Sequence, residues 1–218
     1  MQALFEQCRP ATWGEVIGQE KAIATVAEHR RTGLAGRCYW LSGPTGTGKT
    51  TIARLIAAEV AEPWGIEEID ASEATPARLR DLEADWSTIP LGGRPGRAYI
   101  FNEAHGLRQA AIRKLETMLE RKPRHVTVIF TTTKVGQEKL FELEEDPRPL
   151  LGRCSQLKLT SQGLAPKGAP RLLEIATKAG KRNGQTDAEL VKRCYRLIHD
   201  AKGSLREALQ QIDDGALL

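Results

Sequence analysis

The stretch from Leu41 to Thr50 places glycines and a Lys-Thr pair at the spacing of a phosphate-binding loop, the P-loop. Such a loop lets the backbone wrap closely around phosphates, whose charge is met by free N–H groups at a helix start. Lys49 is then expected to reach the terminal phosphates and the Thr50 hydroxyl a magnesium ion. The residues of the loop and helix start predicted to bind nucleotide are Gly43, Thr45, Gly46, Thr47, Gly48, Lys49, Thr50 and Thr51.

A second polar pair, Asn102-Glu103, follows the apolar run Ala98 to Phe101. In P-loop nucleoside triphosphatases a strand ends here in acidic residues, one near magnesium and one activating the attacking water. Asn102 can accept a hydrogen bond from a metal-bound water but brings no negative charge, so metal affinity or rate should suffer. Thr50 and Asn102 are therefore the predicted metal-side residues, and Glu103 is the predicted general base. His105 is assigned no catalytic role.

Three further residues are weaker candidates by residue type alone. Thr133 ends a β-branched run and could place a hydroxyl near the γ-phosphate, although without the P-loop a plain strand terminus would be the better explanation. Arg153 follows an apolar pair, and Arg206 follows a Gly-Ser pair that can start a helix from Leu205 to Ile212. Single arginines are usually surface residues, so composition leaves both open.

The surrounding elements predict how these residues are positioned. Apolar runs alternate with helical patterns of 10 to 15 residues, which is typical of a parallel α/β sheet. The expected strands are 38–41, 65–70, 98–101 and 126–133; the expected helices are 19–31, 51–60, one with Leu79 and Leu82 inward, and one with Ile112, Leu115, Met118 and Leu119 inward. Residues 1–18 are expected to form a loop on the core. From about residue 164 only helical patterns remain.

Composition narrows the class of protein. The chain has 218 residues, 28% charged and 40% hydrophobic, with a net charge of +4 that permits a polyanionic partner without requiring one. No apolar run approaches the ~20 residues needed to span a bilayer. The four cysteines form no Cys-x-x-Cys pair, so a zinc module and a disulfide framework are not supported. A cytoplasmic protein with no membrane partner is expected, and the acidic cluster Glu142 to Asp146 is interpreted as a solvated face.

Several of these motifs together resemble the ATPase subunits of sliding-clamp loaders in the AAA+ class, namely bacterial DNA polymerase III gamma/tau and the replication factor C small subunits. The opening Arg9-Pro10 with Val16-Ile17-Gly18-Gln19 is similar to the family's adenine-contacting segment, which implies adenine contacts from Val16 and Ile17. Residues 99–107 resemble the family's second strand, departing at Asn102. Thr133 matches its sensor 1 position.

Two arginines gain roles from the same resemblance. Leu151-Gly152-Arg153-Cys154 is similar to a Ser-Arg-Cys motif whose arginine reaches into a neighbouring subunit's ATP, with Gly152 in place of serine. The stretch Gly203 to Leu209 is similar to the sensor 2 motif, which implies that Arg206 contacts the chain's own nucleotide.

The resemblance implies an AAA+ P-loop domain with a parallel sheet over residues 1–163, a small all-helical lid domain over 164–218, and nucleotide between them. It also implies ATP and Mg²⁺ as cofactors, and other clamp-loader subunits, the sliding clamp and primer-template DNA as partners. DNA would be held through its backbone, with Arg108, Arg113 and Lys114 as candidates against a plain solvated helix face. The isolated chain should be a weak ATPase.

Two departures leave assembly open. The family's four-cysteine zinc insertion is missing, and the sequence ends at Leu218, where the family continues into a helical collar. The chain is thus either a fragment or a short relative that assembles differently. Two other functions remain as alternatives. One is an ATP-dependent scaffold with little hydrolysis, suggested by Asn102 and by the missing collar. The other is an AAA+ motor for branched DNA, which shares the P-loop and the Arg-Pro opening.

Overall fold

A computed structural model describes residues 2–90, 92–133 and 148–218. The acidic cluster Glu142 to Asp146 lies outside these residues. By backbone contacts the chain forms two compact units. The helical unit contains residues 1–20, 44–48 and 159–218, and the sheet unit contains residues 21–43 and 49–158. The predicted division into residues 1–163 and 164–218 stays a prediction.

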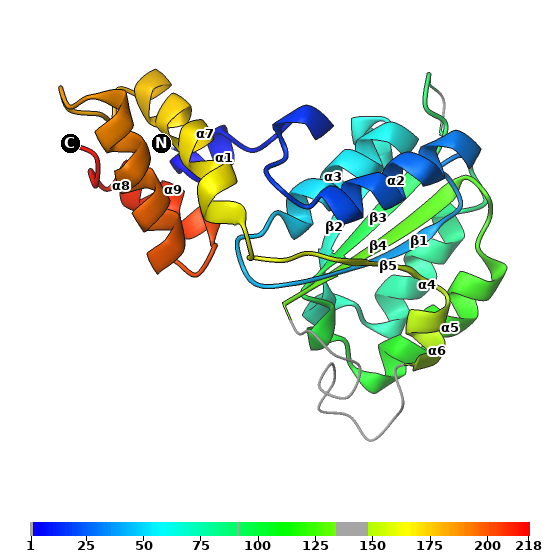
Figure 1. The fold of residues 1–218 in the computed structure, drawn as a ribbon. Helices are drawn as coiled ribbons and strands as arrows, with labels where there is room; N and C mark the ends of the chain where they lie inside the picture. Colours follow the sequence, from blue (N-terminus) through cyan, green and yellow to red (C-terminus); the bar gives the residue numbers. More distant parts are fainter. Residues whose placement is uncertain (1, 91, 134–147) are drawn as a thin grey trace. The chain divides into compact units, whose positions relative to one another are not determined.

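The sheet unit is built on five parallel strands in the order β2-β3-β4-β1-β5 (Figure 1). The strands are β1 (Cys38–Ser42), β2 (Ile66–Asp70), β3 (Arg97–Asn102), β4 (Val126–Thr132) and β5 (Ser155–Lys158). Every residue of β1 and β4 is buried, because both strands lie inside the sheet with helices on its two faces. The register pairs Ser42 with Thr132 and Phe101 with Phe130, so β1, β3 and β4 end at nearly the same level.

Helices cover both faces of this sheet: α2 and α3 lie on one face, and α4, α5 and α6 on the other (Figure 1). Their bounds are α2 (Glu20–Thr32), α3 (Lys49–Val60), α4 (Pro76–Asp85), α5 (Gln109–Arg121) and α6 (Arg148–Gly152); the short 3₁₀ turns are η2 (Pro63–Gly65), η3 (Ala71–Glu73) and η4 (Ala104–Gly106). Aromatic rings occupy the core on one face, where Phe130 lies 5.3 Å from both Trp40 and Phe101. Such ring pairs add to the apolar burial that holds the sheet together.

The helical unit packs α7 (Leu164–Lys178), α8 (Asp187–Asp200) and α9 (Leu205–Asp213) around a core of its own. The chain's opening joins it as α1 (Leu4–Gln7) and η1 (Trp13–Glu15). Leu4 is buried in this core, and its backbone N–H donates to Asp213 Oδ2 at 3.2 Å. This packing explains why residues 1–20 group with the C-terminal helices.

Most of the expected elements are confirmed. The four predicted strands are β1, β2, β3 and β4, and the inward residues of α4 and α5 are buried. The expectation of a plain loop for residues 1–18 is wrong in part, because α1 and η1 form there. The edge strand β5 and the five-residue helix α6 were not anticipated. β5 has only Leu157 buried, so it lacks the apolar run that marks a central strand.

The turn before β3 generates a stability prediction. Gly96 lies so close to Val60 that a Cβ atom on it would be 2.5 Å from the Val60 carbonyl oxygen, the acceptor of the Gly96 N–H. We expect Gly96→Ala to lower the free energy of unfolding by about 1 to 3 kcal/mol, as overpacking does. Gly93→Ala is the matched control, because its Cβ would lie at an ordinary 3.6 Å from Glu62 Oε1. Chemical denaturation measures both variants, and equal stabilities would contradict the prediction.

Candidate nucleotide site

The predicted P-loop follows β1 and ends in helix α3, which begins at Lys49. Gly43, Gly46 and Gly48 all have positive φ, at 155°, 75° and 97°. Side-chain-bearing residues rarely adopt these angles, so the glycines are needed for the loop's path. Lys49 is 6% exposed, and its Nζ donates to the Gly43 carbonyl oxygen at 2.9 Å. The ammonium group is therefore held inside the curve of the loop, beside the start of a helix that favours anions.

Asn102, at the end of β3, faces the first turn of α3. Its Oδ1 accepts a hydrogen bond from Thr131 Oγ1 at 3.0 Å and lies 3.5 Å from Thr50 Oγ1. Its Nδ2 donates to Glu68 Oε2 at 3.3 Å. The two residues predicted to serve the metal, Thr50 and Asn102, are thus in contact.

Magnesium fits this donor set. Mg²⁺ prefers oxygen ligands and keeps several waters, and it is usually held by one or two protein groups plus substrate phosphates. Thr50 and Asn102 offer a hydroxyl and a carbonyl oxygen side by side. Among the described residues no group of three or more His, Cys, Asp or Glu side chains could hold a metal on its own.

Glu103 follows Asn102 and has an unusual backbone, with φ 52° and ψ 50° in the left-handed region. Non-glycine residues are uncommon there and cluster at functional sites. The conformation leaves the carboxylate half-exposed, with Oε2 3.3 Å from His105 Nδ1 and 3.5 Å from Thr133 Oγ1. The predicted general base and the predicted sensor residue Thr133 are therefore neighbours. His105 Nδ1 also lies 3.3 Å from Thr132 Oγ1, so it contacts both the Glu103 carboxylate and the Thr132 hydroxyl.

Asp70 ends β2 and pairs in register with Asn102. Its carboxylate accepts hydrogen bonds from Ser72 Oγ at 2.6 Å and from the Ser72 N–H at 2.8 Å. These two bonds hold the pKa of Asp70 below its usual range. Asp70 stays charged next to Asn102 at neutral pH.

Residues 44–48 of the loop make contacts within the helical unit. The Gly46 carbonyl oxygen accepts a hydrogen bond from the Leu205 N–H at 3.1 Å, at the first residue of α9. Gln19 is buried, and its Nε2 donates to the carbonyl oxygens of Thr47 at 3.3 Å and Thr160 at 2.8 Å. Thr47 Oγ1 closes the loop by donating to the Pro44 carbonyl oxygen at 2.8 Å. Thr45 is exposed on the loop, and Thr51 is buried in α3.

A cavity of about 320 Å³ lies in the helical unit beside the predicted adenine-contacting residues. Val16 and Ile17 line it together with Gly18, Lys167 and Arg171. Small-molecule sites have volumes from about 300 Å³ upward. The predicted pair Val16 and Ile17 therefore borders a space large enough for a nucleobase.

Arg206, in the first turn of α9, lies with its guanidinium 5.4 Å from the centre of the Phe5 ring. The helix is capped by Ser204, whose Oγ accepts from the Glu207 N–H at 3.3 Å. Arg206 is thus one residue from Leu205, which bonds to the loop. Its side chain packs on α1.

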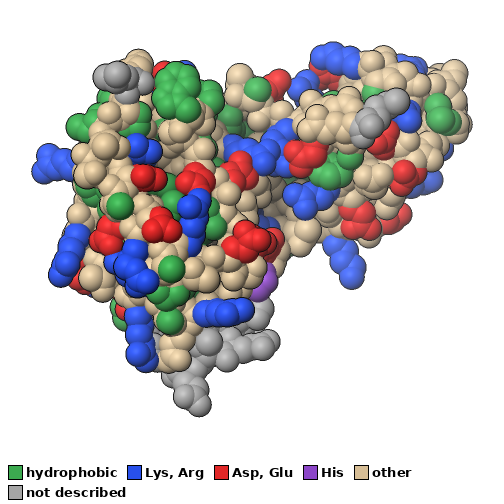
Figure 2. Space-filling model, turned by 180° about the vertical axis from the view of Figure 1, so that it is seen from behind, with side chains coloured by type: hydrophobic (Ala, Val, Ile, Leu, Met, Phe, Trp, Pro, Cys, Tyr) green, Lys and Arg blue, Asp and Glu red, His purple; other side chains and the backbone are tan. Residues whose placement is uncertain are grey.

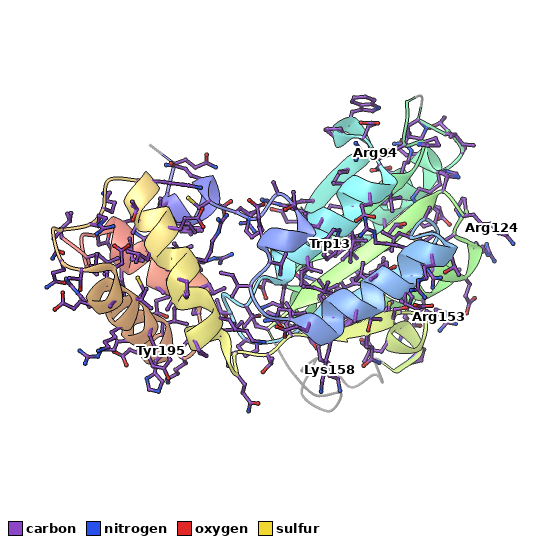
Figure 3. All side chains as sticks on the ribbon, turned by 45° about the horizontal axis from the view of Figure 1, so that its top comes forward. Trp13, Arg94, Arg124, Arg153, Lys158 and Tyr195 are labelled. Atoms are coloured by element: carbon purple, nitrogen blue, oxygen red, sulfur yellow. The ribbon has the colours of Figure 1, made fainter. Side chains whose placement is uncertain are left out.

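Arg153 lies at the amino ends of the strands, whereas the P-loop follows the carboxyl end of β1. It precedes β5, and Ser155 of β5 pairs with Tyr39 of β1, which places Arg153 level with Arg37. Figure 3 shows Arg153 and Lys158 at the two ends of β5, and Lys158 is the one paired with Ser42, beside the P-loop. Residues 37 and 43 are six positions apart, or roughly 20 Å at about 3.3 Å per residue. No arginine side chain spans that distance.

The surroundings of Arg153 fix its position. Its Nη1 donates to the Pro149 carbonyl oxygen at 2.7 Å, and its other nitrogen pairs with Glu120 of α5. Arg153 and Lys122 both line a cavity of about 380 Å³. Lys122 Nζ donates to the carbonyl oxygens of Gly36 at 2.6 Å and Val126 at 2.9 Å. Burial lowers the pKa of Lys122.

The three candidates for DNA contacts lie on or next to α5. Arg108 and Arg113 are exposed, whereas Lys114 is partly buried and pairs with Glu83 of α4. Figure 2 shows Lys and Arg side chains interspersed with Asp and Glu over the drawn face of the sheet unit. Among the described residues on that face, the two signs of charge are mixed.

Within the sheet unit, the structure brings together Thr50, Asn102, Glu103 and Thr133, and it places Arg153 elsewhere. Sequence reasoning missed two residues in this unit: Glu68, which is bonded to Asn102, and His105, which contacts Glu103. In the helical unit it missed Gln19, which joins the loop to Thr160. Gln19 and His105 stood inside recognised motifs, so their positions were a usable signal. Glu68 lies within β2 and gave none.

Comparison with known proteins is consistent with this geometry. Residues 39–156 match the model of the family described as ATPase family associated with various cellular activities (AAA). The chain is 30% identical to the DNA polymerase III subunit tau of Escherichia coli K12, over 97% of this chain and 34% of tau. It is 28% identical to the DNA polymerase III subunit gamma of Buchnera aphidicola from Schizaphis graminum, over 97% of this chain and 60% of gamma. The chain thus spans about a third of tau.

Among solved structures, the Thermotoga maritima RuvB Holliday junction branch migration motor has a similar fold. The TM-score is 0.70 at 22% identity, and the match covers 94% of this chain and 64% of that one. At this identity the likeness concerns the fold alone. Separately, the described helices include none long and apolar enough to cross a membrane.

Lys49 provides the direct test of the loop. We expect Lys49→Ala to weaken ATP binding about tenfold to a hundredfold, because a charge-assisted contact to phosphate is lost, worth about 1.5 to 3 kcal/mol. Isothermal titration calorimetry measures the affinity, and Lys192→Ala on the exposed face of α8 is the control for loss of one positive charge. If the Lys49→Ala protein folded and bound ATP as tightly as wild type, the prediction that this loop binds nucleotide would be wrong.

Proposed function

Because the chain belongs to the AAA family of ATPases, we propose that it is an ATP-binding and ATP-hydrolysing subunit of a DNA sliding-clamp loader in DNA replication. The proposal rests on the group of polar side chains at the carboxyl ends of the strands. Thr50 and Asn102 are 3.5 Å apart there, beside the P-loop lysine and the carboxylate of Glu103. The relatives named tau and gamma, matched along 97% of this chain, support the clamp-loader part.

Each residue has a role in this proposal. Lys49 and the N–H groups at the start of α3 hold the phosphates of ATP. Bound magnesium would neutralise charge on the β- and γ-phosphates. Thr50 contributes its hydroxyl on the metal side, and Asn102 accepts a hydrogen bond from a metal-bound water. Glu103 takes the proton from the attacking water, and Thr133 places its hydroxyl near the γ-phosphate.

Arg153 completes the site of a neighbouring subunit in this proposal. Its place at the amino edge of the sheet, about 20 Å from its own P-loop by strand geometry, supports action on another chain's ATP. Such an arginine finger supplies about 10³ to 10⁵ in rate, so the isolated chain is a weak ATPase. Other clamp-loader subunits, the sliding clamp and primer-template DNA are the proposed partners, DNA being held through its phosphates, in the cytoplasm.

The decisive experiment is multiple-turnover ATP hydrolysis with and without the partners. The chain is mixed with its host's clamp-loader subunits, sliding clamp and primer-template DNA, and phosphate release is followed. We expect stimulation that requires the clamp and the DNA together. Stimulation by a four-way DNA junction without any clamp would instead favour the branched-DNA motor, and binding of ATP with no turnover in any mixture would overturn hydrolysis.

The second candidate is an ATP-dependent scaffold with little hydrolysis. Asn102 favours it, because the position beside Thr50 carries an uncharged amide and brings no negative charge to a cation. In that case ATP binding alone would promote assembly. Assembly that forms equally well with a non-hydrolysable ATP analogue, and never turns over, would select this candidate.

Arg153→Ala tests action on a neighbour. We expect the variant to leave the ATP affinity of the isolated chain unchanged and to lower hydrolysis in the assembly by about 10³-fold or more. Arg124→Ala, at the same end of the sheet, is the matched control (Figure 3). Mixing decides the assignment: a second subunit with intact Arg153 but Lys49→Ala should restore hydrolysis to Arg153→Ala subunits. Failure of this rescue would reduce Arg153 to a residue that only packs on α5.

Arg206→Ala tests contact with the chain's own nucleotide. We expect ATP affinity of the isolated chain to fall about tenfold to a hundredfold, because a charged contact to phosphate is lost. Phe5→Leu is the control, since it removes the ring under Arg206 while keeping apolar volume. If both variants lowered affinity equally, Arg206 would act through its packing on α1 and not through the nucleotide.

A further inference from the structure

The side-chain amide of Asn102 is held in one orientation by its partners. Its oxygen accepts from Thr131 Oγ1 at 3.0 Å and faces Thr50 Oγ1 at 3.5 Å, while its nitrogen donates to Glu68 Oε2 at 3.3 Å. An amide has one accepting end and one donating end, so turning it over would exchange the two. An ionised carboxylate can only accept hydrogen bonds. Glu68 therefore requires the NH₂ group, and the oxygen is left for Thr50.

The fold brings Glu68 to this position. In β2 it lies two residues before Asp70, which pairs with Asn102, so all three side chains are on the same face of the sheet. Helix α3 supplies the last contact: Arg54, one turn after Thr50, donates from Nη2 to Glu68 Oε2 at 3.0 Å. A continuous hydrogen-bonded path thus connects Arg54, Glu68, Asn102 and Thr50.

We propose that Glu68 is a positioning residue for ATP hydrolysis, which fixes the Asn102 amide so that its oxygen faces the magnesium side of the site. The inference rests on the proposed function, because it assumes magnesium-ATP beside Thr50. A freely turning amide would present NH₂ groups to the cation's water shell for part of the time, and those groups cannot accept its hydrogen bonds. The negative charge that Asn102 lacks is thus replaced by a fixed dipole, oriented by the Glu68 carboxylate.

A carboxylate at position 102 would not need this orientation, because both of its oxygens accept. The proposal therefore predicts that the effect of Glu68 depends on the residue at 102. Glu68 should help when asparagine stands there. With aspartate it should be neutral or harmful, since two carboxylates would then share one site. Pure long-range attraction of Mg²⁺ by Glu68 would give the same effect in both backgrounds.

A double-mutant cycle makes the test: wild type, Glu68→Gln, Asn102→Asp and the double variant. The first readout is the Mg²⁺ concentration at which half of the Mg²⁺-dependent increase in ATP affinity is reached, measured by calorimetric titration. The second readout is the rate of steady-state ATP hydrolysis. Glu67→Gln is the matched control, because it removes the same charge from the same strand and breaks a comparable pair with Arg78. Thermal unfolding verifies that each variant is folded.

We expect Glu68→Gln to raise the half-saturating Mg²⁺ concentration about threefold to tenfold in the asparagine background, the scale of one hydrogen bond in a network. In the Asn102→Asp background the same change should have no effect or lower that concentration. Asn102→Asp alone should strengthen Mg²⁺ dependence and raise hydrolysis, because it restores a charge beside the cation. Glu67→Gln should match wild type.

Two results would overturn the proposal: an equal effect of Glu68→Gln in both backgrounds, or an effect no larger than that of Glu67→Gln. In either case wild-type binding of ATP would still depend on Mg²⁺, so the proposed function would stand. If wild-type ATP binding showed no dependence on Mg²⁺ at all, the proposed function would fail first and this inference with it.

Discussion

The parallel register of the sheet is the constraint on which the candidate site depends. The carboxyl ends of parallel strands lie on the same side of the sheet. The loop after β1 and the polar residues after β3 and β4 therefore come together without any long connection. Asn102, Glu103 and Thr133 are each the last residue of a strand or lie directly after one. Arg153 precedes β5, so the same parallel arrangement places it at the amino ends of the strands. The sheet therefore carries the P-loop and the polar residues at the carboxyl ends of its strands, and Arg153 at the amino ends.

Sequence reasoning succeeded where apolar runs are long and buried on both sides. β1, β3 and β4 carry such runs, and the chemistry-bearing residues follow them directly, so both were predictable. β5 has alternating exposure and four residues, and α1 is one turn long, so neither leaves a periodic signal. Glu68 was missed for a different reason. An acid inside a half-exposed edge strand is usually solvated, and only the register of β2 with β3 reveals its contact with Asn102.

Asn102 illustrates how the orientation of an uncharged amide can be fixed by its neighbours. A charged group attracts an opposite charge whatever its orientation, whereas an amide dipole does so only when its oxygen points toward that charge. Partners with fixed donor and acceptor roles can hold the amide in that orientation. Thr131 supplies a donor to the amide oxygen, and Glu68 an acceptor for the amide nitrogen. The orientation of the Asn102 amide therefore depends on the hydrogen bonds that Thr131 and Glu68 make with it.

The glycines of the P-loop are constrained by their backbone angles and by contacts with the protein. A Cβ atom on Gly46 would lie 2.2 Å from Ser204 Oγ, the group that caps α9. Gly48 also has positive φ, but within the described residues a Cβ there would meet no atom closer than 4 Å. The two positions thus need glycine for different reasons, Gly48 for its backbone angles and Gly46 also for the space that α9 requires. The Gly46 carbonyl also accepts the first N–H of α9, so a backbone hydrogen bond joins this part of the loop directly to the helix that carries Arg206.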